Sequence, residues 1–227
     1  MPKNTTDIRT LASVLRRTNY GEADRILNLL TPTGKISAIA RASRKEKSKL
    51  AGGIEMFCLS DFSIHRHGDG LGIITSAKML KFYSNLMTDL ARLELASTIL
   101  KKISLAADSS DSPDFFKIVD QTLPSLNNRA NPALVETWFW LNFARACGEE
   151  INLYRDTTGA KLSPEQSYVW DNIDSAFRSQ VSGNIGADEI KLMRLMVSSD
   201  LNVILRVKDI DTILPPLLPI ARAINKI

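Results

Sequence analysis

Cysteine is scarce in this chain of 227 residues, and long apolar runs are missing. Its two cysteines, Cys58 and Cys147, lie far apart in sequence, which argues against a disulfide framework or a structural zinc site. No apolar run approaches the roughly 20 residues that a membrane-spanning helix needs. The first ten residues, MPKNTTDIRT, hold no apolar segment of the kind found in secretory signals. We therefore expect a cytoplasmic protein that does not contact membranes.

Aromatic residues are rare in the first third of the chain, where positive charge is concentrated. Only Tyr20, Phe57 and Phe62 precede residue 79, whereas twelve aromatic residues follow it. Residues 1–78 hold 13 Lys or Arg against 7 Asp or Glu, while the remainder holds 16 against 18. This asymmetry indicates a polyanionic partner for the first third.

The densest positive charge lies in residues 41–50, RASRKEKSKL, which we call the basic loop. Its five cations are Arg41, Arg44, Lys45, Lys47 and Lys49, and its one acid is Glu46. A cationic loop on a β scaffold suits a phosphate backbone, because each Lys or Arg displaces condensed counterions. Charge alone fits equally well a solvated loop that keeps the protein soluble. Charge alone leaves both interpretations open.

The hydrophobic pattern changes from a period of two to a helical period near residue 78. Strands are predicted at residues 11–16, 25–30, 35–40, 54–66 and 71–77, with turn signals such as Gly68-Asp69-Gly70 between them. Five short strands in this length predict a small closed barrel. Helices are predicted from Met79 onward, at residues 80–95, 96–107, 114–123, 133–147, 168–177, 188–197 and 214–224. The expected fold is α+β, with a barrel domain at 1–78 and an all-α domain at 79–227.

Other cations of the barrel region can extend the basic loop into a wider face. They are Arg16, Arg25 and Lys35, with Arg17 beside Arg16. Arg16 and Arg17 point to opposite sides of a strand, so only one of them can share a face with the loop. Each of these charges is explained as well by an ordinary solvent-facing position. Since aromatic stacking platforms are scarce here, such a surface would hold nucleic acid by its backbone and leave base edges free.

The two histidines, His65 and His67, lie two residues apart on one side of a predicted strand. That spacing can ligate a metal ion, but no third or fourth ligand is evident, and surface histidines beside a turn are the alternative. A metal-dependent hydrolase using this pair is the enzyme hypothesis. No catalytic constellation is recognisable, so we predict no catalytic residues, no metal and no cofactor.

The helical region carries an aromatic run, Trp138, Phe139, Trp140 and Phe143. Helical spacing of this kind usually packs a core, and a pocket for a partner's peptide is the alternative. Four cations are candidates for the rim of an acidic-peptide site: Lys101, Lys102, Arg129 and Arg145.

Several motifs together resemble the N-terminal domain of the RecO recombination-mediator family. They are Leu15-Arg16-Arg17, Tyr20 to Arg25 (YGEADR), Leu30-Thr31-Pro32, Gly34-Lys35, Ala40 to Lys45 and Lys47 to Leu50, continuing through Phe57-Cys58-Leu59 to Thr75-Ser76-Ala77. The resemblance covers residues 8 to about 100 well, and beyond that only helical character matches. It implies an OB-fold followed by a helical domain.

The resemblance also implies a non-enzymatic role in DNA repair. Such proteins bind single- and double-stranded DNA, anneal strands, and help RecR load RecA onto DNA coated by single-strand binding protein, whose acidic C-terminal tail the helical domain binds. The DNA face that it implies here comprises Arg16, Arg25, Lys35, Arg41, Arg44, Lys45, Lys47 and Lys49. A protein-interaction module with only auxiliary nucleic-acid affinity is the alternative function.

Two departures from the family pattern stand out. Residues 148–162 contain no cysteine, where many members carry a four-cysteine zinc module, so the chain resembles a zinc-free member. The family usually has glycine near position 42, whereas this chain has Ala42-Ser43, which leaves the backbone path of the basic loop open.

Overall fold

The computed structural model describes residues 5–68 and 70–225, so Asp69 of the predicted turn and the first four residues lie outside the described part. The chain forms two compact units, Met1–Asn127 and Asn128–Ile227. We call them the barrel unit and the C-terminal unit, and each is described by itself. No helix in the described part of the chain is long and apolar enough to cross a membrane.

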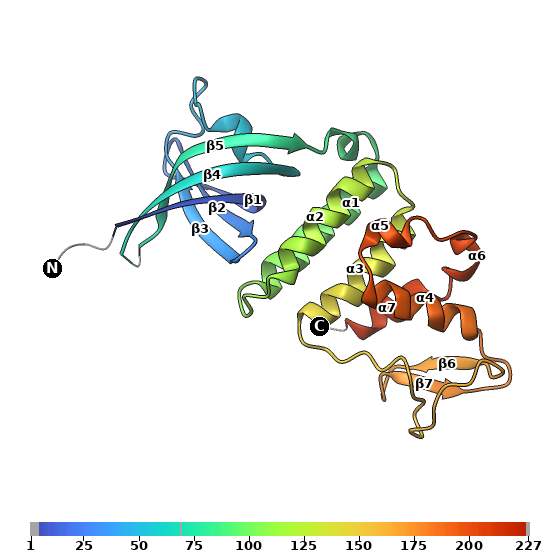
Figure 1. The fold of residues 1–227 in the computed structure, drawn as a ribbon. Coiled ribbons are helices and arrows are strands. Elements are labelled where there is room, and N and C mark those ends of the chain that lie inside the picture. The colour runs from blue at the N-terminus through green and yellow to red at the C-terminus, as the bar shows by residue number, and fades with distance from the viewer. Residues whose placement is uncertain (1–4, 69, 226–227) are drawn as a thin grey trace. The chain divides into compact units, whose positions relative to one another are not determined.

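The barrel unit begins with five strands that close into a barrel (Figure 1). They are β1 (Thr5–Tyr20), β2 (Asp24–Thr31), β3 (Gly34–Ala40), β4 (Cys58–His67) and β5 (Gly72–Phe82). Their order is β1-β2-β3-β5-β4, and β4 pairs back onto β1 to close the barrel. The predicted five-stranded fold is confirmed.

Alternate residues of the strands fill the interior, as the period of two requires. The core includes Ala12 and Val14 of β1, Leu27 and Leu29 of β2, and Phe62 of β4. A bulge interrupts β1, where Val14 pairs with Leu29 but Arg16 pairs with Asn28. The extra residue reverses the alternation beyond it, because a one-residue shift moves each later side chain to the other face.

Strand β5 continues past the predicted boundary, so the helix expected from Met79 is wrong at its start. Met79 pairs with Ser60, and Phe82 pairs with Cys58. Cross-strand pairing overrides the helical spacing of the apolar residues, which a strand of mixed exposure also produces. A short 3₁₀ helix, η2 (Ser84–Thr88), follows β5.

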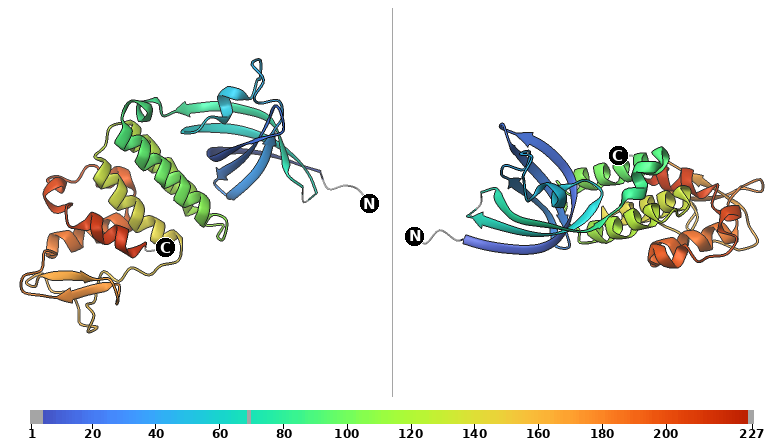
Figure 2. Two further views of the ribbon diagram at one scale, coloured as in Figure 1. Left: turned by 180° about the vertical axis from the view of Figure 1, so that it is seen from behind. Right: turned by 90° about the horizontal axis from the view of Figure 1, so that it is seen from above.

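Two helices complete the barrel unit, α1 (Leu90–Ala106) and α2 (Asp114–Asn127). They lie side by side next to the barrel (Figure 2). Helix α1 starts where Asp89 accepts a hydrogen bond from the backbone N–H of Arg92, which is ordinary N-capping. Both helices belong to the same compact unit as the strands. The predicted division into domains at 1–78 and 79–227 concerns which parts of the chain fold independently, and it stays a prediction.

The C-terminal unit is mainly helical, with one small hairpin. Its elements are α3 (Pro132–Ala146), β6 (Tyr168–Asp171), β7 (Ala176–Ser179), α4 (Ala187–Ser198), α5 (Leu201–Ile204), α6 (Ile210–Ile213) and α7 (Leu217–Ile224). The aromatic run of α3 is buried, which confirms the core interpretation. Trp138 also donates to the carbonyl of Ser199 at 3.0 Å, so this core joins α3 to the end of α4.

The predicted helix over residues 168–177 is wrong, because the segment forms the β6–β7 hairpin. Tyr168 and Phe177 are fully buried against each other with ring centroids 6.2 Å apart. The backbone N–H of Ser163 donates to the hydroxyl of Tyr168 at 2.7 Å and holds that ring in place.

Candidate nucleic-acid interface

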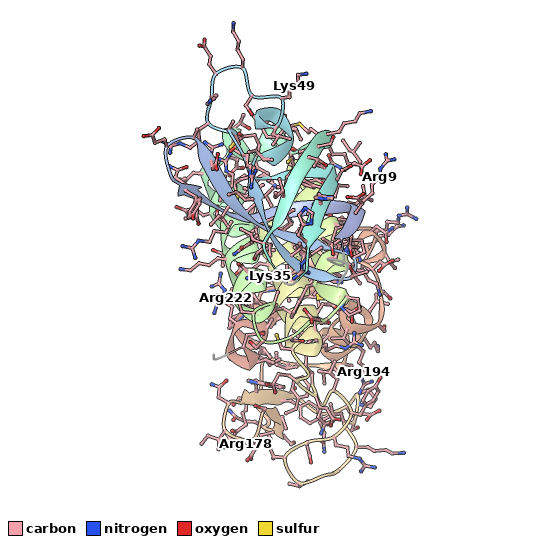
Figure 3. The ribbon with its side chains drawn as sticks, turned by 90° about the vertical axis from the view of Figure 1, so that its left-hand side faces the viewer. Arg9, Lys35, Lys49, Arg178, Arg194 and Arg222 are labelled. Atoms are coloured by element: carbon pink, nitrogen blue, oxygen red, sulfur yellow. The ribbon has the colours of Figure 1, made fainter. Side chains whose placement is uncertain are left out.

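The basic loop joins β3 to the short 3₁₀ helix η1 (Ala51–Ile54) and projects from one end of the barrel (Figure 3). All five of its cations are exposed: Arg41, Arg44, Lys45, Lys47 and Lys49. The structure therefore presents the predicted group of cations together to solvent.

Hydrogen bonds to the β1–β2 turn fix the first half of the loop. The backbone N–H of Ala42 donates to the carboxylate of Asp24 at 2.7 Å. Arg44 donates its backbone N–H to the carbonyl of Ala23 at 2.9 Å and its guanidinium Nη1 to the carbonyl of Gly21 at 3.2 Å. The loop thus has a fixed frame from which its long cationic side chains extend.

Ala42 adopts a left-handed backbone conformation, with φ of 52°. This conformation brings Cβ close to the following carbonyl and costs a non-glycine residue about 1–2 kcal/mol. The bond to Asp24 offsets part of that cost, because a charged acceptor makes a strong hydrogen bond. The open question about the backbone path at Ala42-Ser43 is thus answered: alanine occupies a glycine-like turn.

The far end of the loop is anchored by Gly53 in η1, which packs directly on the barrel. A Cβ added to Gly53 would lie 2.2 Å from the carbonyl oxygen of Ala77 on β5. The neighbouring Gly52 faces open space. One end of the loop is therefore held by hydrogen bonds and the other by close packing.

Arg16 and Arg17 lie on opposite faces of β1, as predicted. Arg16 pairs with Asn28 and is exposed on the outer face of the sheet. Arg17 pairs with the core residue Leu27, and its guanidinium lies 2.7 Å from the carboxylate of Glu55. Only Arg16 presents its charge on the outer face.

Arg25 is half-buried at the end of the barrel, beside the start of the basic loop. It pairs with Ala40, the last residue of β3, and shares a face of β2 with the core residues Leu27 and Leu29. Arg25 therefore lies at the mouth of the barrel, on the face opposite to that of Arg16.

Lys35 lies apart from the loop and is largely occupied. Its ammonium pairs with Asp108 and donates to the carbonyl of Ser104 at 3.1 Å, and its side chain is 9% exposed. Figure 3 shows Lys35 low on the barrel, toward the helices and away from Lys49. The structure does not bring this predicted site residue to the basic loop. No sequence motif near residue 35 predicts the ion pair with Asp108, which lies 73 residues further along the chain.

The two histidines form a small polar cluster with Asp7. The Nδ1 atom of His65 lies 2.6 Å from the carboxylate of Asp7, and its Nε2 atom lies 3.0 Å from Nε2 of His67. Within residues 5–68 and 70–225, no group of three or more His, Cys, Asp or Glu side chains could hold a metal ion.

Burial, hydrogen bonds and nearby charges explain the shifted pKa values of three side chains in the barrel unit. Burial raises the pKa of the Cys58 thiol and, with Asp120 nearby, raises that of the Tyr83 hydroxyl to about 12. Hydrogen bonding from Arg9 lowers the pKa of Asp61. These shifts keep thiol and phenol protonated and the carboxylate ionised near neutral pH, so none of the three is an activated acid, base or nucleophile.

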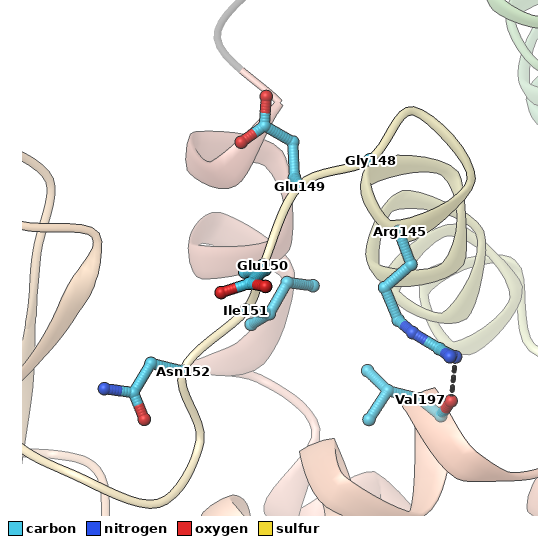
Figure 4. A pocket seen from close by; sticks show the side chains of 7 residues that line it. All are labelled: Arg145, Gly148, Glu149, Glu150, Ile151, Asn152 and Val197. Atoms are coloured by element: carbon cyan, nitrogen blue, oxygen red, sulfur yellow. Dashed lines mark hydrogen bonds between the residues drawn. The ribbon is translucent and has the colours of Figure 1, made fainter.

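The candidate rim cations are divided between the two units. Lys101 and Lys102 lie on α1, whereas Arg129 and Arg145 belong to the C-terminal unit. Arg145 donates to the carbonyl of Val197 and lines an open pocket of about 580 Å³ (Figure 4). Glu149 and Glu150 also line this pocket, and their negative charges disfavour an acidic peptide there.

Comparison with known proteins finds similarity along most of the chain. Residues 5–83 match the family model described as Recombination protein O N terminal. A DNA repair protein RecO of Dehalococcoides mccartyi (strain CBDB1) is 28% identical over 223 residues, which cover 89% of this chain and 83% of that protein. A DNA repair protein RecO of Roseiflexus sp. (strain RS-1) is 34% identical over 147 residues, which cover 64% of this chain and 52% of that protein.

Proposed function

We propose that this chain, whose resemblance to the RecO family is confirmed by these matches, is a DNA-binding recombination mediator in recombinational DNA repair. In this role it binds single- and double-stranded DNA, anneals complementary strands, and assists RecR in loading RecA onto DNA coated by single-strand binding protein. No step of this role requires a catalytic residue. The expected place of action is the nucleoid in the cytoplasm.

The basic loop is the observation that carries the proposal. Its five cations are exposed, and its backbone is bonded to the β1–β2 turn. Because the loop frame is already ordered, phosphate binding has to restrict only the side chains, and the entropic cost of binding is smaller. Arg16 and Arg25 extend the positive surface from two faces of the barrel. Lys35 does not extend it, because its charge is paired with Asp108.

Backbone binding also suits annealing. Cations that hold phosphates of two strands reduce their mutual repulsion, and they leave the pairing edges of the bases open. If each of the five loop cations meets a phosphate, log K for single strands should fall with log salt with a slope of roughly −3 to −4.

Charge reversal in the loop tests this function. The triple variant Lys45→Glu, Lys47→Glu, Lys49→Glu should weaken binding to both DNA forms by about a hundred-fold and abolish annealing by the purified protein. A matched control, Lys117→Glu, Lys161→Glu, Lys208→Glu, changes net charge equally at exposed positions outside the loop. Equal losses in both triple variants, or annealing that survives loop reversal, would refute the proposal.

Partner binding is carried over from the resemblance and needs its own measurement. For the acidic tail of single-strand binding protein, the candidates are Lys101, Lys102, Arg129 and Arg145, of which Arg145 is the least suited because Glu149 and Glu150 line its pocket. Calorimetric titration of the whole protein with the tail peptide tests them. The titration is repeated after neutralising Lys101 and Lys102 together, and again after neutralising Arg129 and Arg145 together. If the purified protein binds the tail but anneals no DNA, the interaction-module function holds instead.

A further inference from the structure

A strip of apolar side chains runs across the outer face of the barrel next to the basic loop. Its members lie on β1, β2, β3 and β5, and we call Tyr20, Ile26, Ile39 and Ile73 the apolar strip. Ile26 pairs with Ile39, and Ile39 pairs with Ile73, so these three share one face. Tyr20 lies on the same side, two residues beyond Thr18, which pairs with Ile26.

This face is the outer one, because the neighbouring residues in each strand fill the core. Leu27, Ala38 and Ile74 are buried in the barrel interior, and each lies next to a member of the apolar strip. The three isoleucines keep part of their surface exposed, and Tyr20 is 56% exposed. Within the described part of the chain, no aromatic ring stacks on Tyr20 and its hydroxyl makes no hydrogen bond.

The position of Tyr20 is tied to the phosphate-binding loop through its neighbours. Gly21, the next residue, accepts a hydrogen bond from Arg44, and Asp24, which pairs with Tyr20, accepts one from Ala42. Arg16 lies on the same face of β1, about 13 Å away at the usual rise of an extended strand. Tyr20 therefore stands between Arg44 of the loop, which is bonded to the adjacent Gly21, and Arg16 further back along β1.

Single exposed aromatic residues are common and need no explanation. Tyr20 differs because it lies at the end of an apolar strip, stands between Arg44 and Arg16, and is next to Gly21, which the loop contacts. Nucleobases stack on aromatic rings, and their phosphates need nearby cations, so this combination matches the chemistry of an unpaired nucleotide.

We propose that Tyr20 stacks on an unpaired base of a strand whose phosphates lie on the basic loop, so that the protein prefers single strands to duplex. This inference rests on the proposed DNA binding and adds its specificity. In a duplex, neighbouring bases already cover both faces of each base, whereas the phosphates stay accessible. Stacking uses the face of a base and leaves its pairing edge open, so it is compatible with annealing.

Substitution of Tyr20 tests the inference. Tyr20→Ala should weaken binding to single-stranded DNA by about five-fold or more, the effect of removing a stacking aromatic ring, and should change duplex affinity less than about two-fold. The salt slope should not change, because no charge is lost. Tyr20→Phe should keep single-strand affinity, since stacking needs the ring and not the hydroxyl. Tyr154→Ala, an exposed tyrosine of the C-terminal unit, is the matched control.

A tryptophan probe gives a direct signal. In Tyr20→Trp, oligo(dT) should quench the added fluorescence, and a duplex of equal length should not. Of the three native tryptophans, Trp138 and Trp140 are buried and Trp170 is half-buried, and all three are also present in the wild-type protein, so the difference from the wild-type signal isolates position 20.

The inference would be overturned if Tyr20→Ala lost affinity for single strands and duplex equally, or lost affinity for neither. It would also be overturned if saturating oligo(dT) did not quench the added fluorescence of Tyr20→Trp. Failure of the proposed function appears elsewhere, as a wild-type protein that binds neither DNA form.

Discussion

The basic loop and Lys35 carry the same kind of charge in one barrel, but their surroundings differ. The loop cations extend into solvent from a frame bonded to the β1–β2 turn. The ammonium of Lys35 is paired with Asp108 and bonded to the carbonyl of Ser104, next to the end of α1. A cation acts on a polyanion only if its field is not already neutralised, so neighbours decide which of these charges is available.

The largest effect should come from the packing that holds the loop. Gly53→Ala places a Cβ 2.2 Å from the carbonyl oxygen of Ala77, and strain of this kind costs about 1–3 kcal/mol or more. Chemical denaturation should show this loss, and DNA affinity should fall as the loop loses its anchor. Gly52→Ala, with open space around it, is the matched control. If both variants are equally stable, the loop is not anchored at Gly53.

Lys35 should matter to stability and not to DNA. Lys35→Ala leaves Asp108 and the carbonyl of Ser104 without their partner and should lower the free energy of unfolding by about 1 kcal/mol. Affinity for DNA and its salt slope should stay at wild-type values. A reduced salt slope in Lys35→Ala would show that Lys35 reaches phosphate after all, and the contrast with the loop would fail.

A single loop cation should show the opposite behaviour. Lys47→Ala should leave the thermal unfolding midpoint unchanged, because its side chain is exposed, and should reduce the salt slope for single strands by about 0.7. Binding titrations over a range of salt concentrations measure this slope. An unchanged slope would mean that Lys47 meets no phosphate.

The smallest effect should come from the turn at the start of the loop. Ala42→Gly relieves the left-handed strain at φ of 52° but makes the unfolded chain more flexible, so we expect a net gain of about 0.5 kcal/mol. Ala51→Gly, in the ordinary backbone of η1, should lose a similar amount. Loss of stability in Ala42→Gly would show that the turn is not strained.

The sequence predicted the parts of the fold that local patterns control. Alternation identified the strands, and the helical period identified α3. It failed where distant residues decide. Pairing with Cys58 keeps Phe82 in a strand, and burial against Phe177 places Tyr168 in a hairpin. The basic loop was visible as a run of charge, whereas the partner of Lys35 and the grouping of Tyr20 with Ile26 depend on tertiary register.

The length of β1 has a consequence for synthesis on the ribosome. This strand pairs with β2 along its C-terminal half and with β4 along its N-terminal half, where Ser13 meets Leu59 and Ile8 meets Ile64. The first hairpin can form as soon as residue 31 has emerged, but half of β1 stays an unpaired edge until β4 follows. Non-local pairing of this kind is slow, and an open edge is prone to aggregation. Asp7 and Arg9 place charges within this edge, and charged residues on an edge strand disfavour its pairing with another chain before β4 arrives.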